Sequence, residues 1–138
     1  MANPGDRNVR FGWWALLVFL LGGLILELLH GFKVSWYLSV EAEPRRLMLQ
    51  LAHAHGTLVA LVNVAFGLTV RALPHRDAWA RRASPCLLSA AILLPGGFLL
   101  GGFGLQGGDP GPGVFLVPVG ALLLAAGVAF TALSLRGE

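Results

Sequence analysis

Four long runs of apolar residues divide the chain, and short polar stretches separate them. A helix needs about 20 mostly apolar residues to cross the hydrocarbon core of a bilayer. The four runs reach this length and cover about residues 11–32, 46–70, 85–105 and 114–135. The pattern predicts an all-α integral membrane protein, with residues 1–138 forming one domain in which four helices make an up-down-up-down bundle.

The composition supports a surface that faces lipid. Of the 138 residues, 56% are hydrophobic and 12% are charged, whereas a soluble domain carries about 25% charged residues. The net charge is +3, and the basic residues lie in the stretches between the apolar runs. This placement does not indicate a nucleic-acid-binding face, so the expected surroundings are the lipid bilayer.

The distribution of basic residues predicts the orientation of the helices. Arg7 and Arg10 precede the first run, and residues 71–82 hold four arginines between the second and third runs. The loop between the third and fourth runs has no basic residue and one acidic residue, Asp109. Because cytoplasmic loops carry an excess of Lys and Arg, both termini are predicted to be cytoplasmic, in a bacterial inner membrane.

Glycines are frequent in the predicted spans and indicate close helix packing. Gly97 and Gly101 form a Gly-x-x-x-Gly pair in the third run, and Gly113, Gly120 and Gly127 recur every seven residues in the fourth. Small residues let the backbones of membrane helices approach one another. Four short spans also bury little surface by themselves, so we expect a homo-oligomer or a subunit of a larger membrane complex.

Ionisable side chains gather in the first two predicted spans. Glu27 and His30 come late in the first span, and His53 and His55 come early in the second, so all four belong to the same half of the bilayer. Ionisable groups within a membrane are costly and usually face a bundle interior or mark a functional site. Three further polar residues of the second span support this group: Gln50, Thr57 and Asn63.

Helical spacing predicts how these side chains point. Glu27 and His30 are three residues apart and share a face, and Gly23 lies on the same stripe, which is therefore expected to face another helix. His53 and His55 are about 200° apart around a regular helix. One of the two histidines should face the first helix, and the other a different helix, a neighbouring subunit or the headgroup region.

A metal or haem site is the leading interpretation of this polar group. Its predicted ligands are His53, His55, His30 and Glu27. Neutral imidazole and carboxylate groups bind zinc, copper or iron, and one or two histidines are sufficient to ligate haem. The site would lie near the periplasmic side, in a protein accessory to a respiratory or metal-handling system.

Two other interpretations stay open. In a structural or assembly subunit, Glu27 would pair with His30 or His53 as a buried hydrogen-bonded clasp, with no cofactor. In an enzyme or transporter component, the same groups would act on a lipid-soluble small molecule such as a quinone. A cavity reaching from His53 to the lipid, lined by glycines of the third span, would favour this last interpretation.

One short segment resembles a known family. Residues 51–58 read Leu-Ala-His-Ala-His-Gly-Thr-Leu, similar to the His-x-His helix start in relatives of the haem-copper oxidase catalytic subunit and in small four-span bacterial membrane proteins. The resemblance covers about residues 20–68 and implies that His53 or His55 is a haem or metal ligand. Ala60 stands where those proteins commonly have glycine, and the last two spans contain no histidine. Oxygen reduction by this chain alone is therefore not supported.

Overall fold

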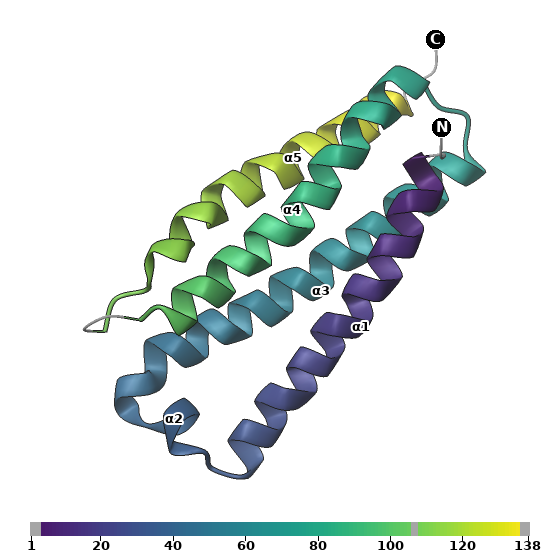
Figure 1. Ribbon diagram of the computed structural model, residues 1–138. Helices are drawn as coiled ribbons and strands as arrows, with labels where there is room; N and C mark the ends of the chain where they lie inside the picture. The colour runs from purple at the N-terminus through teal and green to yellow at the C-terminus, as the bar shows by residue number, and fades with distance from the viewer. Residues whose placement is uncertain (1–3, 106–107, 136–138) are drawn as a thin grey trace.

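The fold is all-helical, and four of its helices are long. A computed structural model describes residues 4–105 and 108–135, and these residues contain no β-strand (Figure 1). Four helical segments are long and apolar enough to cross a membrane. Two of these segments include the short 3₁₀ helix that precedes the long helix. The chain is thus a multi-pass membrane protein, as the apolar pattern predicted. The long helices are α1 (Pro4–Gly31), α3 (Glu43–Ala72), α4 (Asp77–Phe103) and α5 (Leu116–Ser134).

The helices differ from the apolar runs mainly at their starts. Helix α1 begins at Pro4 rather than near residue 11, and α4 begins at Asp77 rather than near residue 85. Apolarity marks the part of a helix that can lie in hydrocarbon, whereas backbone hydrogen bonds can continue the helix beyond it. Helix α5 begins two residues later than its run because Pro112–Phe115 form a 3₁₀ turn.

The four long helices lie side by side in the order α1, α3, α4, α5 (Figure 1). Helix α3 packs against α1 and α4, and α5 packs against α4, while α1 touches α4 over a short length. Helices α1 and α5 lie at the two edges and do not pack against each other. The start of α1 and the end of α5 lie at the same end of the bundle (Figure 1). The bundle is therefore open, with α3 and α4 as its central pair.

Glycines bring neighbouring helices into close contact. A Cβ atom on Gly12 of α1 would lie 2.7 Å from a methyl carbon of Val64 in α3. A Cβ atom on Gly120 of α5 would lie 2.5 Å from the backbone nitrogen of Leu94 in α4. Gly113 and Gly127 also face α4 without room for a side chain. The predicted role of the seven-residue glycine spacing in close packing is confirmed.

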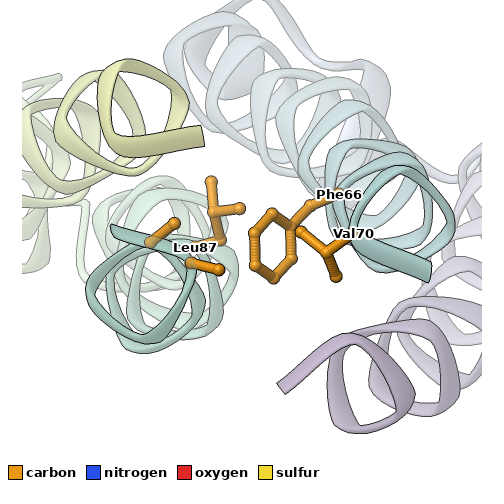
Figure 2. Packing of buried hydrophobic residues seen from close by; sticks show 5 residues of the cluster. Phe66, Val70 and Leu87 are labelled. Atoms are coloured by element: carbon orange, nitrogen blue, oxygen red, sulfur yellow. The ribbon is translucent and has the colours of Figure 1, made fainter. Parts of the chain in front are cut away.

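An apolar cluster joins the two central helices near the chain termini. Phe66 and Val70 of α3 face Leu87 of α4 (Figure 2). Two alanines of α4, Ala80 and Ala83, complete the buried cluster. Packed apolar side chains thus hold α3 and α4 together at this end.

A short connection closes the opposite end. Between α1 and α3 it contains α2 (Ser35–Leu38) and a 3₁₀ turn (Val40–Ala42), which the apolar pattern did not predict. Tyr37 of α2 is 1% exposed, and Arg46 of α3 donates a hydrogen bond of 3.2 Å to its carbonyl oxygen. Arg45 donates to the carbonyl of Trp36 and lies over its ring. These contacts hold α2 against the start of α3.

Replacing Gly120 with alanine should destabilise the fold by about 1–3 kcal/mol, the usual cost of overpacking. The added Cβ would meet backbone atoms of Leu94, so α4 and α5 would have to separate. Unfolding in mixed detergent micelles, followed by circular dichroism, measures the change. Gly31→Ala is the matched control, because a Cβ there meets no atom within 4 Å. Equal stability of the two variants would contradict the packing role.

Candidate functional site

A polar cleft lies between α1 and α3, at the end opposite the chain termini. Its volume is about 550 Å³. Four of the predicted site residues line it, two from each helix: Glu27, His30, Gln50 and His53. The buried Tyr37 of α2 also lines the cleft, with its ring edge-on to that of His30. The first helical hairpin therefore brings these polar groups together, as the sequence predicted.

His53 is held by the backbone of α1. Its Nδ1 atom lies 2.8 Å from the carbonyl oxygen of Phe19. A carbonyl oxygen only accepts hydrogen bonds, so Nδ1 carries the proton that is donated to it. In the neutral ring, Nε2 then has a free lone pair. Gly23 makes this contact possible, because a Cβ there would lie 2.5 Å from the His53 ring. The stripe of α1 that contains Gly23 thus faces α3, as predicted.

The hydrogen-bonded clasp between Glu27 and a histidine is not formed. Among the residues that the structure describes, no hydrogen bond or ion pair joins Glu27 to His30 or His53. Glu27 lies eight residues beyond Phe19, about 12 Å further along the helix axis, whereas His53 bonds at the level of Phe19. A clasp between α1 and α3 does exist, but its acceptor is a backbone carbonyl.

His55 points away from the polar cleft. Its Nδ1 atom lies 2.9 Å from the carbonyl oxygen of Leu51, one turn earlier in α3. Its ring lies 4.9 Å from the ring of Phe98 in α4, measured between centroids. The prediction that His53 and His55 face different helices is confirmed. Within residues 4–105 and 108–135, no group of three or more His, Cys, Asp or Glu side chains is placed to hold a metal ion. Metal or haem binding stays a prediction.

An apolar groove lies next to the polar cleft, between α1, α3 and α4. Its volume is about 370 Å³. Gly22 of α1 and Gly96 of α4 line it, and a Cβ on either would meet no atom within 4 Å. Three apolar side chains of the lining are more than 40% exposed, so the groove opens onto the lipid-facing surface: Val18, Ile92 and Leu99.

His53 lines both the polar cleft and the apolar groove. Leu26 does so as well, but His53 is the polar side chain that the two share. On the far wall of the groove, Pro95 lies within α4. Because proline has no N–H, the carbonyl of Ala91 lacks its usual helical donor. Among the described residues that line the apolar groove, His53 alone carries a polar side chain.

The other two supporting residues lie elsewhere on α3. The hydroxyl oxygen of Thr57 is buried and makes no hydrogen bond with the described part of the chain. Asn63 lies nearer the chain termini, in a buried network rather than in the cleft. It accepts a hydrogen bond of 2.8 Å from Asn8 of α1 and donates one of 3.1 Å to the carbonyl of Leu87 in α4. The expectation that Asn63 supports the His53 group was therefore wrong.

The buried network joins three helices. Ser84 of α4 donates a hydrogen bond to Asn8, and Arg7 donates one of 2.9 Å to Ser84. Asn8, Asn63 and Ser84 are each fully buried. Asn8 and Ser84 lie outside the predicted spans, which is why the sequence did not indicate them. A signal was present in the sequence, because both are small polar residues just before an apolar run. It would have indicated the network only if the predicted helices had begun a turn or two earlier.

No protein-family model matches this chain, and no curated protein or solved structure matches it. The resemblance of residues 51–58 to relatives of the haem-copper oxidase subunit therefore stays a prediction.

Replacing Asn8 and Asn63 with alanine, singly and together, should reveal coupling between them. We expect a coupling free energy of about 0.5–2 kcal/mol, because hydrogen bonds between membrane helices have measured values in this range. Unfolding of the four proteins of the double-mutant cycle in mixed micelles measures it. Strictly additive destabilisation would show that the Asn8–Asn63 hydrogen bond does not stabilise the packing of α1 on α3.

Proposed function

We propose that this chain binds a small lipid-soluble molecule, whose apolar part lies in the groove and whose polar end reaches His53. One observation carries the proposal: His53 is the polar side chain shared by the apolar groove and the polar cleft. An amphiphilic molecule has an apolar part and a polar end, so it binds where an apolar surface meets a polar one. Ligand sites are typically apolar pockets with a few polar groups that fix the orientation of the ligand.

The dimensions and the opening of the groove support this function. A volume of about 370 Å³ lies in the range of roughly 300–1,000 Å³ that is typical of small-molecule sites. Val18 and Ile92, each 62% exposed, flank the groove at the surface that faces lipid. A molecule dissolved in the bilayer would therefore enter sideways, without passing through water.

Gly22 and Gly96 independently support the binding of a small molecule in the groove. Glycine inside a helix costs about 0.5–1 kcal/mol relative to alanine, and at Gly12, Gly120 and Gly127 close helix packing offsets this cost. Gly22 and Gly96 have no packing partner within 4 Å of a Cβ position. What they provide is open space in the groove.

A quinone is one molecule of this kind. Its ring would lie beside His53, and its apolar tail would follow the groove to the lipid. Glu27 and His30 line the polar cleft together with His53, so they would lie between the ring and water at the periplasmic end. The protein would then be a component of an enzyme or transporter for such molecules.

Filling the groove should abolish binding. Gly22→Leu and Gly96→Leu place a side chain in open space, so we expect folded proteins that lose a lipid-soluble molecule that copurifies with the wild type. Solvent extraction of the purified proteins, followed by mass spectrometry, measures the bound molecule per chain.

Gly31→Leu is the control for this experiment, since Gly31 is equally open but does not line the groove. Equal extraction from wild type, Gly22→Leu and Gly96→Leu would contradict the proposal. Stoichiometric metal, or a haem absorption band, in the wild-type protein would favour the metal or haem site instead.

We propose that the chain lies in a bacterial inner membrane with both termini on the cytoplasmic side. Four arginines lie where α3 ends and α4 begins, at the same end of the bundle as the start of α1 (Figure 1): Arg71 in α3, Arg76 in the loop, and Arg81 and Arg82 in α4. This agrees with the excess of basic residues in cytoplasmic loops. Fusions of alkaline phosphatase, which is active only in the periplasm, should be inactive after Ser134 and active after Val40. The reverse result would invert the orientation.

A further inference from the structure

We infer that the site selects a ligand with a hydroxyl group as its polar end, in preference to one with only a carbonyl or ether oxygen. This inference rests on the proposed function, because it concerns the same groove. It follows from the hydrogen bond that fixes the His53 ring, and it makes the Nε2 atom of His53 the group that determines specificity.

The fixed ring presents an acceptor. Since Nδ1 donates its proton to the carbonyl of Phe19, Nε2 of the neutral ring has a lone pair and no hydrogen. No described residue makes a hydrogen bond to Nε2. His53 is half-buried and lines both the polar cleft and the apolar groove, so its ring is accessible from the site. A hydroxyl group can donate to this atom, whereas a ketone or ether oxygen cannot.

The rest of the groove offers no competing polar side chain. Among the described residues that line it, His53 alone carries a polar side chain, so the polar side chain that a ligand meets there is an acceptor. A phenol, a lipid alcohol or a quinol has the matching donor, and the oxidised quinone lacks it.

A redox-inert pair of probes tests the inference. The compound 4-nonylphenol and its methyl ether have nearly the same size and apolar tail, but the phenol alone has a hydroxyl hydrogen. Binding to the wild-type protein in nanodiscs is measured by calorimetry, with Gly22→Leu nanodiscs subtracting partition into lipid. We expect the phenol to bind about three- to tenfold more tightly, the ratio that corresponds to one hydrogen bond of ordinary strength.

Two substitutions locate the effect. His53→Asn keeps an amide N–H near the position of Nδ1 but has no group at the position of Nε2, so the advantage of the phenol should fall below about twofold. His53→Gln returns an amide group to the position of Nε2 and should restore part of the preference. The comparison in the wild type stands by itself if either variant does not fold.

The outcomes separate the two proposals. Saturable binding of both probes with equal affinity, lost in Gly22→Leu, would overturn the hydroxyl preference and leave the groove as a ligand site. A preference that is unchanged in His53→Asn would also overturn it. Absence of saturable binding of either probe to the wild type would count against the proposed function itself.

Discussion

The hydrogen bond from His53 to the carbonyl of Phe19 is the interaction on which the candidate site depends. It ties α3 to the backbone of α1, fixes which nitrogen of the ring carries the proton, and leaves the other nitrogen without a hydrogen-bond partner among the described residues. Backbone contact of this kind requires a helix surface without a side chain in the way, and Gly23 provides it. A polar group within hydrocarbon must find a partner in the protein, and here the partner is main chain, so a substitution of the Phe19 side chain leaves the acceptor in place.

Glycines have two different roles in this molecule. At Gly12 and Gly120 the neighbouring helix occupies the space that a side chain would need, so these residues set the distance between helices. At Gly22 and Gly96 that space is empty and belongs to the apolar groove. The sequence does not separate the two roles, because both kinds lie in apolar helices. The distinction depends on which residue of the neighbouring helix stands opposite.

Hydropathy alone was sufficient to predict the four long helices and their approximate extents, because the bilayer sets the length of an apolar run. Helical spacing also predicted that His53 and His55 face different helices. The partner of His53 was not predictable, since a side chain that bonds a backbone carbonyl leaves no mark on the residue that supplies it. The buried Asn8–Asn63–Ser84 network was missed for a different reason, namely that apolarity ends before the helices do.

The buried network and the groove are two consequences of one arrangement. Near the chain termini, Asn8 of α1 is hydrogen-bonded to Ser84 of α4, and Phe11 packs on the apolar cluster around Leu94. Towards the other end, α1 diverges from α4 (Figure 1), and the groove occupies the space between them, over α3. A helix that is fixed to α4 at one end and bound to α3 along its length must leave such a space. The network thus lies away from the site and holds α1 against α4 at the end of the bundle where the groove is absent.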